Sequence, residues 1–330
     1  MKESIFNIKD EKDFEYWCLK IFRHQYLHCV VYRNYVDGIG VNHEEVMKIS
    51  DIPFLPIQLF KSNKVVSDEA FPEENSAVFS SSATTGMTPS HHYISDLSLY
   101  EKSFLEGFRF FYGDPSQYCF LALLPSYLER EGSSLVYMVS RLIELSNHPE
   151  SGFYLYNRED LHRMILSLKE RRIKVVLFGV AFALLDYANE FSSDGVDFSD
   201  DLIVIETGGM KGRAEELTRE ELHRRLSNAF GVKNIHSEYG MCELLSQGYS
   251  TGDGTFMTPT WMKILIRDLI DPFSFVEDGV RGGINIIDLA NINSCSFIET
   301  EDLGRVQNGK FTVEGRIATS ERRGCNMLLE

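Results

Sequence analysis

The strongest constraint on the fold is a regular alternation of apolar and amphipathic segments between residues 118 and 230. The apolar segments are short and uninterrupted, which is typical of strands buried on both faces of a parallel sheet. The intervening segments repeat apolar residues at helical spacing, as helices that cover a sheet do. We therefore predict an α/β fold of parallel βαβ units. The expected strands are 119–124, 152–156, 173–178 and 201–207, and the expected helices are 133–146, 158–171, 181–191 and 218–230.

The flanking regions have a different character. Residues 1–75 are expected to form a helical cover, with a helix at 10–29, a looser segment after it and an extended segment at 51–57, where prolines oppose a helix. Ser95 is a plausible N-cap for a helix that follows it. In residues 249–330 glycines separate short apolar runs such as 264–266 and 284–287, which indicates a β-rich subdomain of hairpins followed by a C-terminal tail. We treat 1–330 as a single domain.

Composition excludes several classes of function. The 330 residues are 43% apolar, as in globular proteins, and carry a net charge of −16 without a basic stripe, so a nucleic-acid partner is not expected. The longest apolar run, 175–185, is shorter than the roughly 18 residues that a membrane span requires, and the start of the chain lacks a signal-peptide pattern. Six cysteines without a C-x-x-C pair indicate free thiols rather than zinc or redox sites. We expect a cytoplasmic protein.

A loop rich in serine and threonine follows the apolar approach at 77–79. Closely spaced backbone N–H groups and hydroxyls in such a loop bind anions, and phosphate is the usual guest. The Walker spacing and its lysine are absent, and the alternative is an ordinary polar turn. The candidate phosphate-binding residues are Ser81, Ser82, Thr84, Thr85 and Gly86.

Three further motifs lie at the ends of expected strands, where α/β proteins bind ligands. Glu206-Thr207-Gly208-Gly209 comes first, and Glu238-Tyr239-Gly240-Met241-Cys242-Glu243 follows it. The last is Thr300-Glu301-Asp302-Leu303-Gly304-Arg305, with Gly315-Arg316 close behind. Each motif is weak alone, and their value lies in their order along the chain.

This series resembles the adenylate-forming superfamily of acyl-CoA synthetases, aryl-acid ligases and adenylation domains. A closer resemblance is to LuxE-type acyl-protein synthetases. It rests on Pro53-Phe54-Leu55-Pro56, on 124–130, on Thr207-Gly208-Gly209-Met210-Lys211-Gly212 and on the ending Arg323-Gly324-Cys325. The resemblance implies the N-terminal domain of the superfamily, with parallel βαβ sheet layers and a small β-rich subdomain near the C-terminus. The usual C-terminal domain is expected to be absent.

The resemblance also implies a role for each matching residue, with ATP and Mg²⁺ as cofactors. The serine and threonine loop would hold the phosphates, and Glu243 would bind Mg²⁺. The backbone at Gly208 and Gly209 would flank the adenine, with Tyr239 stacking near it and Gly240 in the same nucleotide site. Asp302 would bind the ribose hydroxyls, Arg316 would mark the hinge, and Cys325 would accept the acyl group.

The implied activity is adenylation of a fatty or other carboxylic acid, transfer of the acyl group to Cys325 and delivery to a partner such as an acyl reductase. Arg322 and Arg323 would favour the Cys325 thiolate. Two alternatives stay open: a CoA ligase-like enzyme with an idle Cys325, and a non-catalytic subunit that binds nucleotide or acyl groups. Residue by residue, Glu243 could be a surface carboxylate, Tyr239 a core residue, Asp302 a turn former and Cys325 an ordinary thiol.

Three departures from the superfamily pattern concern the phosphate site. Ala83 stands where many relatives have glycine, and Cys242 replaces the usual threonine before Glu243. Pro89-Ser90-His91 stands where a lysine often follows the loop, so phosphate charge must be met elsewhere. The acyl chain length is left open, because apolar residues such as Phe104, Phe108 and Leu123 suit a tunnel or a core equally well.

Overall fold

The computed structural model describes residues 2–67, 74–81, 88–124, 132–154, 157–191, 201–208 and 217–317. The chain forms two compact units. The first unit comprises Met1–Tyr100, Glu243–Ser246 and Met257–Glu330, and the second comprises Glu101–Cys242 and Gln247–Phe256.

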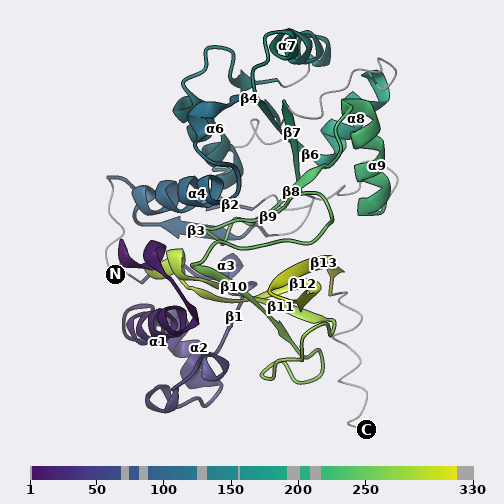
Figure 1. Ribbon diagram of the computed structural model, residues 1–330. Coiled ribbons are helices and arrows are strands. Elements are labelled where there is room, and N and C mark those ends of the chain that lie inside the picture. Colours follow the sequence, from purple (N-terminus) through teal and green to yellow (C-terminus); the bar gives the residue numbers. More distant parts are fainter. Residues whose placement is uncertain are drawn as a thin grey trace. The chain divides into compact units, whose positions relative to one another are not determined.

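The second unit contains the predicted parallel sheet. Its strand order is β5-β4-β6-β7-β8-β9, and all neighbours are parallel except β9, which runs antiparallel to β8. Figure 1 shows α6 on one side of this sheet and α8 with α9 on the other. The strands are β4 (Cys119–Leu123), β5 (Gly152–Phe153), β6 (Val175–Val180), β7 (Leu202–Thr207), β8 (His236–Tyr239) and β9 (Gly248–Ser250). The helices are α6 (Ser134–Ser146), α7 (Arg158–Glu170), α8 (Ala181–Phe191) and α9 (Arg219–Phe230), with a 3₁₀ turn η4 (Pro115–Gln117) before β4.

The sequence explains these elements directly. Every residue of β4 and β6 is buried, as expected for strands with helices on both faces. The hydroxyl of Ser133 accepts a hydrogen bond from Val136 N at the start of α6, and Thr218 caps α9 through Glu221 N. The predicted α/β fold with parallel βαβ units is confirmed, and the candidate tunnel residues Phe104, Phe108 and Leu123 are buried.

The first unit is built on a mixed sheet with the order β1-β12-β11-β10, in which β13 also pairs with β12. β1 runs parallel to β12, and the other pairs are antiparallel, which confirms the predicted hairpins. A separate antiparallel pair, β2-β3, carries the start of the serine and threonine loop. The strands are β1 (Leu55–Pro56), β2 (Ala77–Ser80), β3 (His91–Ile94), β10 (Met262–Arg267), β11 (Gly282–Asp288), β12 (Phe297–Gln307) and β13 (Lys310–Arg316).

Helices α1 (Glu11–His28), α2 (Val30–Gly38) and α3 (Leu59–Ser62) also belong to the first unit. Asp10 caps α1 by accepting from Asp13 N at 2.9 Å. α4 (Leu97–Tyr112) begins in the first unit and ends in the second. Short 3₁₀ turns are η1 (Ser4–Asn7), η2 (His43–Glu45), η3 (Ile49–Asp51) and η5 (Leu289–Asn293).

Two local predictions are wrong. The segment after Cys29 is the helix α2 rather than a looser stretch, because Tyr32 and Val36 are fully buried at helical spacing before the glycine at position 38 ends it. The cap of α4 is Asp96 rather than Ser95, since the Asp96 carboxylate accepts from Ser98 N at 3.2 Å. Within the described residues, no helix combines the length and apolar character needed to cross a membrane.

Candidate functional site

The segment Glu243–Ser246 belongs to the first unit, although the residues on both sides of it belong to the second. Asp288, which is fully buried, accepts hydrogen bonds from Leu245 N and Ser246 N at 2.9 Å each and from Ser246 Oγ at 2.6 Å. The Nδ2 atom of Asn291 donates to the backbone oxygen of Glu243 at 2.7 Å. The side chains of Asp288, which caps η5, and of Asn291, which lies in η5, therefore hold the backbone segment that carries Glu243.

A glutamine of α1 supports η5 in turn. Gln25 is fully buried, and its Nε2 donates to Asn291 O at 2.9 Å. Its Oε1 accepts from Ser296 N at 3.0 Å. Because both ends of this buried amide are satisfied, the position of η5 is tightly specified.

The side chain of Glu243 is almost fully enclosed, with 5% of its surface exposed. Burial raises the pKa of its carboxyl group, while a hydrogen bond from the Ser90 side chain and the positive charges of Arg316 and Lys61 oppose that shift. The alternative that Glu243 is a surface carboxylate is wrong. A carboxylate offers the hard oxygen donor that Mg²⁺ prefers.

Ser90 connects Glu243 to the start of the predicted phosphate loop. Ser81 N donates to Ser90 O at 3.0 Å, and Ser90 N donates to Ser81 Oγ at 2.9 Å, which extends the β2-β3 ladder by one pair. In the sequence, Ser90 is distinguished only as part of Pro89-Ser90-His91, which stands where a lysine often follows the loop. Its position directly after the loop, where the return strand begins, was the available signal. Ser82, Thr84, Thr85 and Gly86 lie outside the described residues.

Asp302 and Arg316 face each other across β12 and β13, where they are register partners. Arg316 Nε lies 3.4 Å from Asp302 Oδ1, with 75% of the arginine side chain exposed and 13% of the aspartate side chain. The structure thus connects Ser81 to Glu243 through Ser90, and connects Arg316 to both Asp302 and Glu243 by charge. All of these residues lie in the first unit.

The second unit holds the remaining described positions. Gly208 follows the last residue of β7 with a φ of +70°, a conformation that favours glycine. Beside it, Thr207 Oγ1 donates to Glu238 Oε2 within the sheet. Burial raises the pKa of Glu238 to about 7, the neighbouring charge of Glu206 adds to the shift, and the bond from Thr207 opposes it. Gly209 lies outside the described residues.

Tyr239 is the last residue of β8, and Gly240 follows it. Tyr239 is buried, and its ring centroid lies 6.0 Å from that of Phe256 with an interplanar angle of 63°. A Cβ atom at Gly240 would come within 2.3 Å of Glu238 Oε1, so glycine at this position makes room for that carboxylate. These contacts fit the core alternative for Tyr239, and its stacking on adenine stays a prediction.

A polar network beside β8 was not predicted from the sequence. Tyr112 Oη lies 3.2 Å from His236 Nδ1, and His223 Nε2 lies 3.4 Å from Glu206 Oε1. Burial, with a smaller effect from His223, lowers the pKa of His236 to about 4, so its ring is neutral at pH 7. His223 in α9 and His236 in β8 are isolated histidines, and no motif in the sequence indicates that they lie close together.

Cys325 lies outside the described residues. The other five cysteines are buried. In the described part of the chain, no group of three or more His, Cys, Asp or Glu side chains could hold a metal ion. Mg²⁺ commonly keeps several waters and binds one or two carboxylates together with substrate phosphates, so a single carboxylate such as Glu243 is compatible with that arrangement.

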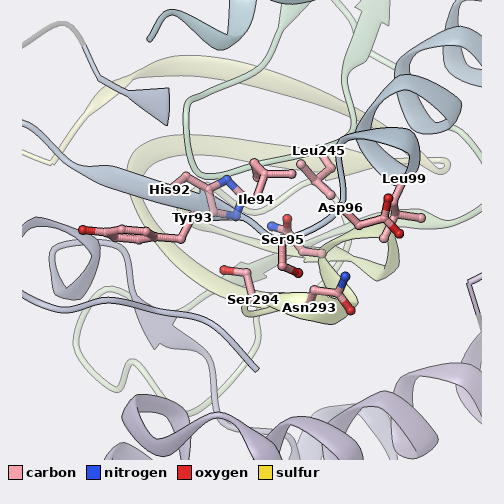
Figure 2. A pocket seen from close by; sticks show the side chains of 10 residues that line it. His92, Tyr93, Ile94, Ser95, Asp96, Leu99, Leu245, Asn293 and Ser294 are labelled. Atoms are coloured by element: carbon pink, nitrogen blue, oxygen red, sulfur yellow. The ribbon is translucent and has the colours of Figure 1, made fainter. Parts of the chain in front are cut away.

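A small cavity lies close to the Glu243 segment, between the β3–α4 region and η5 (Figure 2). Its volume of about 10 Å³ is that of roughly one water molecule. Leu245 and Asn291 contribute to its lining. It is too small for a nucleotide or an acyl chain.

Solved structures define the class of this fold. 2-Hydroxyisobutyryl-CoA ligase in complex with 2-HIB-AMP and CoA matches with a TM-score of 0.71 and 12% identity, covering 94% of this chain and 70% of that one. ATP-bound MatB from Rhodopseudomonas palustris matches with a TM-score of 0.51 and 18% identity, covering 73% of this chain and 48% of that one. The chain has the fold of the adenylate-forming ligases, as predicted.

Sequence comparison finds similarity over part of the chain. Residues 6–103 match the family of acyl-protein synthetases, LuxE. The long-chain-fatty-acid–luciferin-component ligase of Photorhabdus luminescens is 35% identical over 69 residues, which is 21% of this chain and spans 57% of that protein. The predicted resemblance to LuxE-type acyl-protein synthetases is confirmed.

Proposed function

We propose that this protein is a ligase that activates a fatty or other carboxylic acid with ATP and Mg²⁺ and transfers the acyl group to Cys325. The acyl group would then pass to a partner such as an acyl reductase. The fold and the sequence matches support acyl activation. The observation that carries the proposal is the chain of hydrogen bonds from Ser81 through Ser90 to Glu243.

That chain supports phosphate and metal binding for a physical reason. It joins the first residue of an anion-binding loop to a buried carboxylate, so phosphate oxygens and a magnesium ligand would be presented together. Mg²⁺ would neutralise phosphate charge. Arg316 is mostly exposed and Lys61 is partly exposed, so both could follow the charge that develops on the phosphates. Gly208, Gly209, Tyr239 and Gly240 would hold the adenine, and Asp302 the ribose.

The proposed reaction has two steps, adenylation and acyl transfer. A carboxylate oxygen of the acid attacks the α-phosphorus of ATP, the bond to the β-phosphate oxygen breaks, and pyrophosphate leaves. The Cys325 thiolate then attacks the acyl carbonyl, forming a thioester and releasing AMP. The protein mainly positions the groups and stabilises charge, because the leaving groups are already good.

Burial of the other thiols supports Cys325 as the acceptor. Burial raises the pKa values of Cys29 and Cys295, and that of Cys119 to about 11, so these thiols stay protonated and enclosed. Arg322 and Arg323 precede Cys325 in the sequence. Two neighbouring guanidinium groups would favour the thiolate form that acyl transfer needs.

CoA is a second candidate acceptor. The matched 2-hydroxyisobutyryl-CoA ligase was solved with both 2-HIB-AMP and CoA. In that case the first step is unchanged, and CoA replaces Cys325 in the second.

The first test is pyrophosphate release with carboxylic acids of increasing chain length. We expect release with at least one acid, and a loss of at least about 100-fold in Glu243→Gln, because one charged ligand of the magnesium ion becomes neutral. Glu277→Gln removes an exposed carboxylate and serves as the matched control. Release that is unchanged in Glu243→Gln would remove that residue from the site, and no release with any acid would contradict acyl activation.

Intact-protein mass measurement identifies the acceptor. After incubation with ATP, Mg²⁺ and the active acid, we expect an increase equal to one acyl group, which is absent in Cys325→Ser. Pyrophosphate release should persist in that variant, because adenylation precedes transfer. Free acyl-CoA without a protein adduct would instead assign the second step to CoA.

A further inference from the structure

A cavity of about 210 Å³ lies in the first unit, on residues that the proposed function does not use. It is built from segments distant in sequence: the end of α2, residues 50–54, the turn before Phe275, and positions on β11 and β12. An apolar cavity of about 150 Å³ holds benzene, so this one accommodates a molecule of about ten non-hydrogen atoms.

The walls of the cavity are apolar and aromatic. Phe54 and Phe275 pack edge to face with ring centroids 5.8 Å apart, which sets the shape of one wall. Phe273 closes another side while 62% of its surface stays exposed. Its turn is fixed by Asp268 Oδ1, which accepts from Asp271 N at 3.0 Å. The cavity is therefore preformed around an apolar body.

The polar lining is concentrated in a few side chains. Tyr35, Asn285 and Glu299 contribute a hydroxyl, an amide and a carboxylate, and Asp51 adds a second carboxylate. Burial, with a smaller effect of the Glu299 charge, raises the pKa of Tyr35 to about 12, so its hydroxyl remains a donor and acceptor at pH 7. Converging polar groups in an apolar cavity are typical of small-molecule sites.

Arg267 lies behind these groups and sets the charge balance. It is 3% exposed and donates to Ile284 O at 3.0 Å, Asn285 Oδ1 at 2.9 Å and Thr300 O at 2.7 Å. Its Nη2 also lies 3.5 Å from Glu299 Oε1. Its donors are therefore shared among backbone, amide and carboxylate oxygens.

Counting these charges points to a cationic guest. The two lining carboxylates and Arg267 sum to −1, and no basic side chain lines the cavity among the described residues. Lys48 Nζ lies 3.8 Å from Asp51 Oδ1, but its side chain is 68% exposed and screened by water. A ligand with a single positive charge would neutralise the group.

We propose that this cavity binds a small organic ammonium ion with an aromatic or branched apolar body. The ammonium group would lie toward Glu299, the hydroxyl of Tyr35 and the carboxylate of Asp51. The apolar body would lie against Phe54, Phe273 and Phe275. The residues of this site differ from those of the proposed adenylation chemistry. The proposal can therefore be tested independently of that function.

The test is an NMR titration of the full chain with 2-phenylethylammonium, the neutral 2-phenylethanol and the anionic 3-phenylpropionate. For a ligand of this size we expect a Kd on the order of 1 mM for the cation. The alcohol and the acid should bind at least about ten-fold more weakly. Shift changes should centre on Ile39 and Ile52, which line the cavity. No binding, or equal affinity for cation and alcohol, would overturn the proposal.

Variants locate the contacts. Glu299→Gln should weaken the cation about ten-fold and leave the alcohol unchanged, while Glu277→Gln, an exposed carboxylate outside the lining, should change neither. Because Glu299 also pairs with Arg267, its loss could affect folding. Phe273→Ala removes a mostly exposed wall and avoids that problem; it should weaken the cation and the alcohol alike. Cation affinity unchanged in both folded variants would overturn the site.

Discussion

At Gly240 the missing side chain makes room for a neighbouring carboxylate. Glu238 Oε1 would lie 2.3 Å from a Cβ atom there, closer than non-bonded atoms approach. That oxygen is at the end of a side chain, but the side chain is buried and accepts a hydrogen bond from Thr207. It therefore cannot move away without losing a buried interaction.

Gly240→Ala is expected to destabilise the protein by about 1–3 kcal/mol, because the added methyl group displaces the Glu238 carboxylate. Urea unfolding measures this. The matched control is Gly107→Ala in α4, where a Cβ would meet nothing within 4 Å. That change should be neutral or stabilising by up to about 1 kcal/mol.

A double-mutant cycle tests whether the Glu238 side chain causes the destabilisation in Gly240→Ala. In the Glu238→Ala background the cost of Gly240→Ala should fall to near zero, because the clashing atoms are gone. A cost that stays the same in both backgrounds would show that backbone strain, and not the carboxylate, requires glycine there.

Glu238 also makes the stability of the folded protein depend on pH, and its raised pKa fixes the direction of that dependence. Burial raises the pKa of Glu238 from 4.5 to about 7, so the folded state keeps a proton that the unfolded state loses above pH 4.5. Its contribution to stability is thus fully present below pH 4.5 and is lost as the pH rises to about 7.

Glu238→Gln replaces the protonated acid with a neutral amide and should remove this loss. The difference in unfolding free energy, wild type minus variant, is expected to fall by ~1–3 kcal/mol between pH 4.5 and 7.5. Urea unfolding at several pH values measures it, with Glu277→Gln as an exposed control. A difference that stays constant with pH would contradict the raised pKa of Glu238.

At the scale of elements, η5 and its cap hold the segment that carries Glu243. Asp288 accepts three hydrogen bonds from Leu245 and Ser246, and Asn291 donates to Glu243. The segment has few other regular backbone bonds, because it is neither helix nor strand. Its conformation therefore depends on two side chains supplied from more than forty residues away.

Asp288→Ala should cost about 2–4 kcal/mol, because four buried donors, Leu245 N, Ser246 N, Ser246 Oγ and Ala290 N, lose their acceptor. Pyrophosphate release should fall with it, since the Glu243 backbone is released. Asp271→Ala, which removes an exposed turn acceptor for Phe273 N, should cost under about 1 kcal/mol and leave activity intact. Wild-type stability in Asp288→Ala would contradict the anchoring role.

Arg267 plays a comparable role within the mixed sheet. It lies on β10 and donates to oxygens of Ile284 on β11 and Thr300 on β12, so it crosses three strands. Gly283 allows this, because a Cβ there would come within 2.4 Å of the guanidinium carbon. The buried charge is compensated by polar partners, as it must be.

Arg267→Met keeps the aliphatic volume and removes the donors. We expect a loss of about 2–4 kcal/mol, because Ile284 O and Thr300 O lose a buried partner. Thermal unfolding with circular dichroism measures it, and Arg281→Met, a half-exposed arginine that pairs with Glu314, is the control. Equal stability of the two variants would contradict the role assigned to Arg267.

At the scale of the whole molecule, charge is the property that the sequence fixes most directly. A net charge of −16 makes the compact state repel itself, and salt screens that repulsion with a Debye length of about 10 Å at 0.1 M. Raising NaCl from about 0.02 to 0.3 M should therefore increase the unfolding free energy by ~0.5–1 kcal/mol. Urea unfolding measures it, and KCl should act equally; a decrease would mean that attractive ion pairs dominate.

The parallel sheet of the second unit and the hairpins of the first could be predicted from the sequence alone. Strands such as β4 and β6 are apolar throughout and their helices carry local caps, so each element is specified by neighbours in sequence. The sequence also identified Glu243 and Asp302 as candidate site residues, because the order of motifs can be read directly along the chain. Where two signals competed, as at α2, the glycines at 38 and 40 outweighed the buried spacing of Tyr32 and Val36, and the prediction was wrong.

The partners of those residues could not be predicted, because they come from segments far apart in the sequence. The parallel pairing of β1 with β12 joins Leu55 to Ile298, and nothing local in either segment indicates it. The same holds for the bond from Ser90 to Glu243 and for the anchoring of residues 243–246 by Asp288. The physical reason is that a buried polar group needs a partner but does not determine where in the sequence that partner lies; packing of distant elements supplies it.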